Sequence, residues 1–232
     1  MVTREAPAAT ASEQSQRLKM TYEEFLEWAG ESRQAEWVNG EVIVFMPPKT
    51  PHARLISFLN TLLNLFVKFF NLGEVLPAPY EMKVSPTGSG REPDIIFIAA
   101  AHRDRVTPEK LLGPADLVVE IVSDDSVSRD RVDKFGEYEE ISVPEYWIID
   151  NRPGRRQRAE FYQLDEGGQF QPVPVGKDGI YRSKVIPGFW LNVNWLWAEE
   201  FPDPQLTFAE IAGPATVIAK LQELNAKARP AE

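Results

Sequence analysis

The run from Asp116 to Val122, DLVVEIV, constrains the fold more than any other part of this chain. Its apolar residues follow one another without regular alternation, which is typical of a strand covered on both faces rather than of an open edge. Similar strand-like runs occupy 92–98 and 145–150, and apolar residues recur at helical spacing from Leu55 to Phe66. We therefore expect a buried central sheet with helices packed against it.

The N-terminal third predicts a helix, a hairpin and a second helix. Thr21 and Glu24 fit a capping box at the start of the first helix. Asn39-Gly40 supplies the two positive φ angles of a type I′ turn between two strands. Thr50-Pro51 places a cap and then a proline at the start of the second helix, which residues 71–73 (NLG) close.

The rest of the chain predicts a strand at 74–84, a helix from Ser126 or Ser128 to about Ile141, and then the strand at 145–150. A meander of strands follows at 158–164, 169–175 and 179–186. After it come a Trp-rich covering segment at Pro187–Phe201 and a terminal helix at Pro214–Lys227. The expected fold class is α/β (α+β), with a central mixed β-sheet flanked by helices, an N-terminal β-hairpin and a C-terminal helix.

Length and composition set the expected organisation. We expect a flexible N-terminal tail at 1–19, one domain over 20–200 and a C-terminal helical extension over 201–232. No apolar run is long enough to cross a bilayer, and the first residues lack a signal-peptide core. With no cysteine in the chain either, a cytoplasmic protein without a membrane partner is expected.

The net charge of −10 argues against a protein that holds long nucleic acid by bulk electrostatics, because such binding rests on neutralising phosphates. A local basic patch can still lie on an acidic protein. Arg152, Arg155, Arg156 and Arg158 form such a cluster, and we consider them for phosphate contacts. The alternative is an ordinary charged turn exposed to solvent.

Two acidic residues are candidates for a metal site. If 92–98 and 116–122 are neighbouring strands, Asp94 and Glu120 meet at one end of the sheet and can bind a hard cation such as Mg²⁺, or Mn²⁺ in its place. A lone charge inside an apolar strand costs several kcal/mol, to order of magnitude, unless it is paired or metal-bound. A structural salt bridge to a buried Arg or Lys is the alternative for Glu120. Lys134 has an alternative of its own, an ordinary helix pair with Asp130 at i, i+4.

Several separated motifs resemble those of a known family. Between Gly113 and Asp150 the chain contains GPADLVVEIVSDDS, RDRVDKFGEY and VPEYWIID, and Glu92-Pro93-Asp94 lies upstream. Over about 20–195 these motifs are similar to a large bacterial family of restriction-endonuclease-like proteins. That family was formerly classed as a domain of unknown function and belongs to the PD-(D/E)xK superfamily. The resemblance implies a nuclease fold and a metal-dependent active site.

The resemblance also implies roles for individual residues. Asp94 and Glu120 would be metal ligands, with the backbone carbonyl of Ile121 as a third. The common superfamily pattern has lysine two residues after the glutamate, where this chain has Val122, and in this family Lys134 of the following helix would supply it. Further candidates are Glu41 as an accessory acid, or else a solvent-facing hairpin residue, and His52 and Tyr138 as residues that line the site.

The function expected is a Mg²⁺-dependent endonuclease that hydrolyses phosphodiester bonds of DNA, acting as a homodimer. One alternative is a catalytically inactive binding module, which predicts that Asp94 and Glu120 are paired with basic side chains. Another is a hydrolase of a small phosphate-containing substrate. The nuclease predicts instead an open acidic cleft with a basic rim and Lys134 pointing inward.

Overall fold

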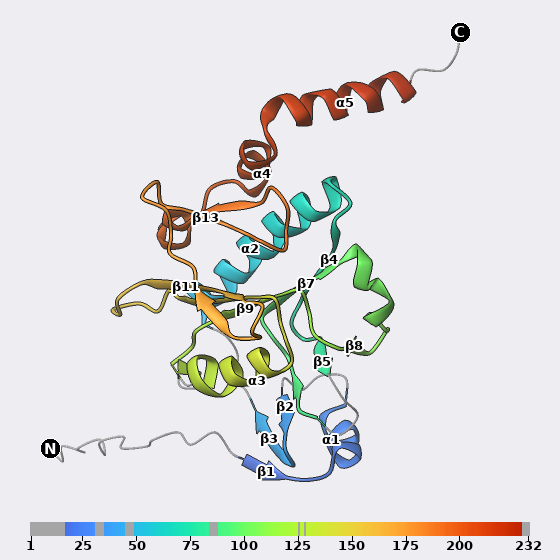
Figure 1. The fold of residues 1–232 in the computed structure, drawn as a ribbon, viewed down its shortest axis with the longest axis vertical. Coiled ribbons are helices and arrows are strands. Elements are labelled where there is room, and N and C mark those ends of the chain that lie inside the picture. Colours follow the sequence, from blue (N-terminus) through green and yellow to red (C-terminus); the bar gives the residue numbers. More distant parts are fainter. Residues whose placement is uncertain are drawn as a thin grey trace, which may run out of the picture.

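The computed structural model describes residues 17–30, 35–44, 49–83, 88–124, 126–127 and 129–228. Its centre is a six-stranded mixed sheet in the order β12-β11-β10-β9-β7-β4 (Figure 1). Only β9 and β10 run parallel, and all other neighbours are antiparallel. The strands are β4 (Gly73–Pro77), β7 (Ile95–Ala99), β9 (Leu117–Ile121), β10 (Glu145–Asp150), β11 (Arg158–Leu164) and β12 (Phe170–Pro172). The predicted central mixed sheet is confirmed.

The two faces of this sheet alternate residue by residue. Leu117, Val119 and Ile121 of β9 pack into a core cluster with the helix α2 (Thr50–Phe69). Val118 and Val122 pack on the opposite face with the helix α3 (Lys134–Glu140). Because side chains alternate along a strand, Glu120 points to the α3 face, and all of β9 is buried as its composition predicted.

Helix α2 covers one face of the sheet (Figure 1). It begins at Thr50, with Pro51 in its first turn, but the capping position is Lys49, which makes no side-chain cap. The predicted Thr50 cap is therefore wrong by one residue. The end of the helix agrees better with the sequence, because Asn71 adopts a left-handed φ of 54° just beyond Phe69.

A second six-stranded sheet lies beside the first, in the order β1-β3-β2-β6-β5-β8, with helix α1 (Tyr22–Ala29) packed beside β2. Its strands are β1 (Arg17–Lys19), β2 (Ala35–Val38), β3 (Glu41–Val44), β5 (Glu81–Lys83), β6 (Gly90–Arg91) and β8 (Lys110–Leu112). The β2–β3 hairpin turns through Asn39 at φ 50° and Gly40 at φ 86°, as predicted. The capping box is confirmed as well, because Thr21 Oγ1 accepts a hydrogen bond from Glu24 N (3.2 Å) and the Glu24 carboxylate accepts one from Thr21 N (2.8 Å).

The sequence missed β1, β6 and β8. Residues 17–19 were expected in the tail, yet they pair with β3 as strand β1. The rest of the predicted tail, 1–16, lies outside the described residues. A pairing of three residues or fewer leaves almost no periodic signal, and its partner strand decides whether it forms.

The segment that leads into α3 is also irregular. The single helix predicted from Ser126 or Ser128 is divided into a π-helical turn η2 (Arg129–Asp133) followed by α3. Ser126 is not a simple cap: its hydroxyl accepts from Ser123 N and donates to Asp130. Ser128 lies outside the described residues. A 3₁₀ turn, η1 (Ala100–Arg105), follows β7.

The C-terminal part covers the α2 face. Strand β13 (Ile180–Arg182) pairs with β14 (Trp190–Asn192) in a separate two-stranded sheet, so the predicted three-part meander is wrong beyond β12. The 3₁₀ turn η3 (Val193–Trp197) and helix α4 (Pro204–Ala212) follow and pack on the α2 cluster. The Trp-rich segment therefore covers the core as expected.

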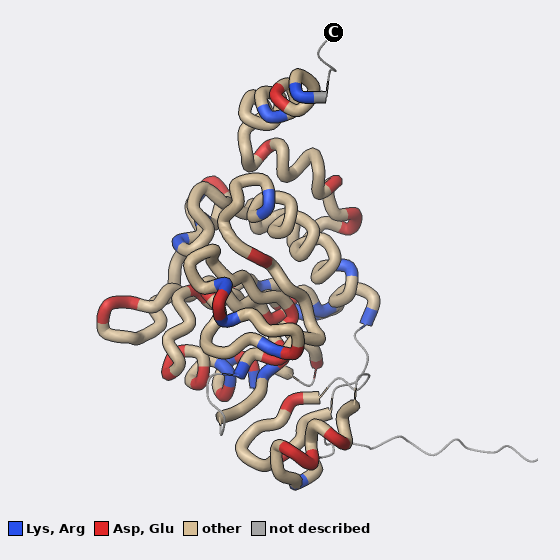
Figure 2. The backbone as a smooth tube through the Cα atoms, turned by 90° about the vertical axis from the view of Figure 1, so that its right-hand side faces the viewer, with Lys and Arg blue, Asp and Glu red and all other residues tan. Residues whose placement is uncertain are grey.

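Helix α5 (Pro214–Ala228) ends the described chain and stands clear of the rest in both views (Figures 1 and 2). It buries none of its described residues, whereas α4 buries Phe208 and Ile211. The predicted terminal helix is thus present, and the helix at 204–212 was missed. Among the described residues no helix is long and apolar enough to cross a membrane.

Candidate active site

Asp94 and Glu120 meet at the junction of two strands. β7 and β9 pair with Ile95 opposite Val119, so extending this register by one residue brings Asp94 opposite Glu120. The Asp94 carboxylate Oδ2 accepts a hydrogen bond from the backbone N of Ile121 at 2.6 Å. The structure therefore brings together the two acidic residues that the sequence singled out.

Glu120 is held from helix α3. Its carboxylate Oε1 accepts hydrogen bonds from Lys134 Nζ (2.8 Å) and from Tyr138 OH (2.9 Å). These two donors lie four residues apart on α3, which places them on the same helix face. A lysine displaced from the strand to the helix thus reaches the glutamate, and Tyr138 donates to the same carboxylate.

Lys134 contacts more than one carboxylate. Its Nζ lies 3.1 Å from Glu36 Oε1 and 3.9 Å from Asp130 Oδ1. Glu36 in turn accepts from Arg91 Nη1 (2.8 Å), and Arg91 also binds Glu137 in α3. Through Lys134 this buried network joins the hairpin strand β2 of one sheet to β9 of the other.

Glu36 and Arg91 were not among the candidate residues that the sequence indicated. Glu36 carries the same signal as Glu120, a charged residue inside a strand whose neighbours are buried. The sequence instead suggested Glu41, which begins β3 and lies 4.0 Å from Lys19 Nζ. An acidic side chain of the hairpin does contact Lys134, but it is Glu36.

The site holds more carboxylates than cations. The pKa of Glu120 is raised to about 8: burial raises it most, and Asp130, Asp94 and Glu36 also raise it, although Lys134 lowers it. For Lys134, burial favours the neutral amine, but the charges of Glu120, Glu36 and Asp130 outweigh burial and raise its pKa. Lys134 is therefore a fixed positive charge, and it does not balance the surrounding carboxylates.

His52 lies in the first turn of α2 and completes the contacts of Asp94. Its Nε2 is 3.3 Å from Asp94 Oδ1, and its buried Nδ1 has no hydrogen-bond partner within the described ranges. The Asp94 side chain is 18% exposed, against 5% for Glu120. Solvent therefore reaches this end of the site from the Asp94–His52 side.

The donor set suits a hard divalent cation. Two carboxylates, with the carbonyl of Ile121 beside them in the chain, supply the oxygen ligands that Mg²⁺ prefers. The excess of negative charge around Glu120 is what such a cation would neutralise. No group of three or more His, Asp or Glu side chains in the described part of the chain is arranged to hold a metal ion. A cation bound here would therefore keep several waters, as Mg²⁺ commonly does.

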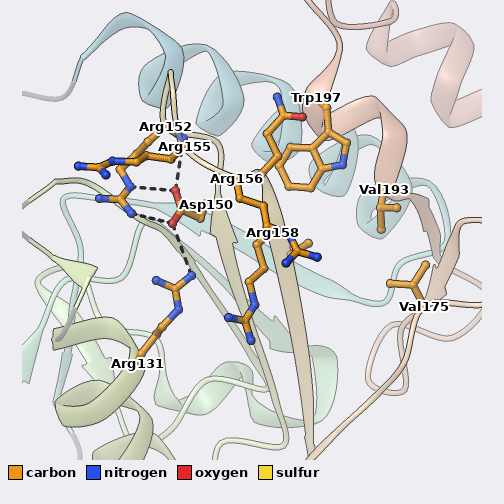
Figure 3. A pocket seen from close by; sticks show the side chains of 11 residues that line it. Arg131, Asp150, Arg152, Arg155, Arg156, Arg158, Val175, Val193 and Trp197 are labelled. Atoms are coloured by element: carbon orange, nitrogen blue, oxygen red, sulfur yellow. Dashed lines mark hydrogen bonds and ion pairs between the residues drawn. The ribbon is translucent and has the colours of Figure 1, made fainter.

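The arginine cluster lines a pocket of about 850 Å³ beyond the end of β10. Arg152 binds Asp150 at 2.9 Å and Asp124 at 3.3 Å, while the side chains of Arg155 and Arg156 line the pocket (Figure 3). Figure 2 shows acidic residues spread over much of the chain, so this concentration of arginines is a local feature of an acidic protein. The predicted phosphate contacts remain proposals.

The comparisons with known proteins agree with this fold. A profile of the Uma2 family, described as "Putative restriction endonuclease", matches residues 22–194. No curated protein matches the chain. Among solved structures the chain is similar to a crystal structure described as a "putative nuclease" from Anabaena variabilis, with 18% identity and a TM-score of 0.55. The match covers 77% of this chain and 97% of that one, and at this identity it shows the fold alone. Because the family profile spans well over half of the chain, this protein belongs to the Uma2 restriction-endonuclease family.

Proposed function

We propose that this protein is a metal-dependent endonuclease that hydrolyses phosphodiester bonds of DNA at the Asp94–Glu120–Lys134 site. One observation carries the proposal: Lys134 Nζ bonds to Glu120 Oε1 at 2.8 Å, across the strand junction from Asp94. Family membership supports a nuclease function, and the acidic site supports Mg²⁺ or Mn²⁺ as the cofactor.

The chain's own residues have separate tasks in this proposal. Asp94 and Glu120, with the Ile121 carbonyl, would hold the cation, which supplies an activated water and neutralises charge on the phosphodiester. Lys134 keeps a permanent positive charge beside Glu120, where it stabilises negative charge that develops on the phosphate. Glu36 and Tyr138 fix Lys134 and Glu120 in place, and His52 orients Asp94.

A non-catalytic binding module is the second candidate. Glu120 is only 4% exposed and already paired with Lys134, which is what that alternative predicts. The inward orientation of Lys134 is what the nuclease predicts. The two expectations are each met in part, so an activity measurement must decide between them.

The test is a cleavage assay on single-stranded and duplex DNA, RNA and a small phosphodiester, with Mg²⁺, Mn²⁺ or EDTA. We expect metal-dependent cutting of DNA that falls on the order of 100-fold or more in Asp94→Asn, Glu120→Gln and Lys134→Met. Glu140→Gln is the matched control, because this exposed carboxylate lies on the same helix α3. Wild-type protein that neither cuts nor binds Mg²⁺ in calorimetry would establish the binding module instead. Cutting of the small phosphodiester alone would point to a small substrate.

We further infer that the protein is a homodimer through α5. Its exposed apolar side chains are Ile218, Leu221 and Leu224, at 54%, 59% and 54% exposure. They recur at intervals of three residues, so they share one side of a helix whose side chains are mostly exposed. We also propose that the protein is cytoplasmic, because the proposed substrate is DNA.

A further inference from the structure

The arginine pocket adjoins the candidate active site but takes no part in it. It lies where β10 and β11 meet the C-terminal covering segment, and five arginines contribute to its wall (Figure 3). Its volume of about 850 Å³ falls within the roughly 300–1,000 Å³ of ordinary ligand pockets. A pocket of this size can enclose a ligand of about the size of a nucleotide, rather than only an ion.

The charges in the pocket are only partly balanced. Asp150 is held by Arg152 Nε at 2.9 Å and by Arg131 Nη2 at 3.5 Å, and Arg158 pairs with Glu160 at 2.9 Å. In contrast, the guanidinium groups of Arg155 and Arg156 make no ion pair or hydrogen bond with any described residue. Both are exposed, so two unpaired cations face the pocket of a protein with a net charge of −10.

The opposite wall is apolar. Trp197, Val193 and Val175 line it, and Figure 3 shows them across the pocket from Asp150. Trp197 is partly buried against the α2 core cluster, which fixes the ring while part of it remains accessible. Guanidinium forks match phosphate geometry, and an indole face stacks on any nucleobase. The arginine wall therefore suits a phosphate and the Trp197 wall suits a base, so the pocket as a whole suits a nucleotide.

A second cavity lies beside this pocket, toward the start of α2. It has a volume of about 220 Å³ and shares Gln157 and Trp197 with the first. It ends on Thr50 and Pro51, next to His52, whose Nε2 lies 3.3 Å from Asp94. Asn151 Nδ2 donates to the Pro51 carbonyl at 3.3 Å and so ties the end of β10 to this helix start. The two cavities adjoin at Gln157 and Trp197, and the second extends toward the start of α2.

We propose that the arginine pocket binds a single-stranded segment of nucleic acid, with one base stacked on Trp197 and neighbouring phosphates of the strand on Arg155 and Arg156. A base inside a duplex has both faces covered by its neighbours, so only an unpaired, unstacked base can lie on Trp197. The inference rests on the proposed function for the link to cleavage. The binding itself needs neither the metal nor the catalytic groups.

The test measures binding in EDTA by fluorescence anisotropy, with a labelled 12-nucleotide single strand and the matching duplex. We expect the single strand to bind at least about tenfold more tightly than the duplex. Arg155→Ala/Arg156→Ala and, separately, Trp197→Leu should each weaken single-strand binding by about tenfold, consistent with the energy of a stacked base or of phosphate contacts. Trp197→Phe should retain most of the affinity, because it keeps an aromatic face.

Two controls make the result specific. Lys220→Ala/Lys227→Ala removes the same charge from α5, away from the pocket, and should leave binding unchanged. The wild-type protein is also tested for cutting of the same strand with Mg²⁺, and binding without cutting would refute the nuclease while keeping this inference. Equal affinity for duplex and single strand would overturn the inference. So would arginine and tryptophan variants that bind like the lysine control while remaining folded by circular dichroism.

Discussion

Lys134 is enclosed by protein, and its ammonium group contacts three carboxylates. Replacing it by methionine keeps most of the side-chain volume but leaves Glu36 and Glu120 without their shared cation. We expect Lys134→Met to lower the free energy of unfolding by about 3–5 kcal/mol, the usual cost of removing one partner from a buried pair. Urea unfolding measures it. Adding Glu120→Gln should recover part of the loss, and a single variant as stable as wild type would contradict the network.

Asp150, which lines the arginine pocket, should make the stability of the protein depend on pH. Burial opposes its ionisation, but hydrogen bonds and charge from Arg152, with Arg131, outweigh burial and lower its pKa from the ordinary 3.8. A carboxylate with a lowered folded-state pKa stabilises the fold fully above its unfolded pKa, and this stability is lost as the pH falls through the folded value. We expect Asp150→Asn to be about 1 kcal/mol less stable than wild type at neutral pH. In urea unfolding, this difference in stability should shrink as the pH falls below 3.8 and through the lowered folded-state pKa of Asp150. A difference that is constant with pH would show that the ion pairs do not contribute.

At this scale the sequence predicted the site through a single kind of signal. Glu120 is a charge inside an apolar strand, and together with Asp94 it indicated the site, whereas the role of Lys134 came from the resemblance to a family. Glu36 has the same signal but in a strand of only four residues, where burial cannot be inferred from so short a pattern. Trp197 reads as a core residue in the sequence, because nothing there shows that it lines a pocket with Arg155 and Arg156.

Two glycines test how the elements are built. Gly40 sits in the hairpin turn at φ 86°, and a Cβ there would meet no atom within 4 Å, so Gly40→Ala introduces backbone strain alone. We expect it to destabilise the protein by about 1–2 kcal/mol. Gly136 lies exposed inside α3, also with open space around a Cβ, so Gly136→Ala should stabilise by roughly 0.5–1 kcal/mol. The midpoint of thermal unfolding should fall for Gly40→Ala and rise for Gly136→Ala. Shifts of the same sign would contradict the turn or the helix.

Elements with strong local signals were predicted well, and those fixed by distant partners were not. The hairpin, α2, β9 and β10 follow from turn residues, helical spacing or continuous apolar runs. β13 leaves the expected meander because its partner is β14, about ten residues further along the chain. The π-helical turn before α3 has no sequence signal of its own, yet it leads directly to Lys134, and such turns often accompany functional sites.

For the whole molecule, element order was enough to predict the mixed sheet and its helices, but not how the second sheet attaches. That attachment depends on Glu36, Lys134 and Arg91, which connect β2, α3 and β6. Three charged residues far apart in sequence carry no pairing information until the chain has folded. The sequence therefore predicted the central sheet but not the charged network that attaches the second sheet to it.

The separate position of α5 leads to a prediction about assembly. Ending the chain after Gly213 removes a helix that buries none of its described residues, so the midpoint of thermal unfolding of the remaining domain should change little at low protein concentration. We expect light scattering to show a dimer for the full chain and a monomer for the shortened one. Leu221→Asp is a milder version of the same change and should act alike. A full chain with the mass of one copy would exclude the dimer, and a shortened chain that still dimerises would move the contact elsewhere.

Lys134 belongs to a seven-residue helix entered through a π-helical turn, and not to the buried strand that holds Glu120. Short peripheral segments open far more often than a central sheet unfolds. Each opening of α3 would carry the ammonium group away while every strand stayed paired, and reclosing would return it. The local stability of this one short helix would then set the highest temperature at which the site is intact. That temperature would lie well below the temperature at which the whole protein unfolds.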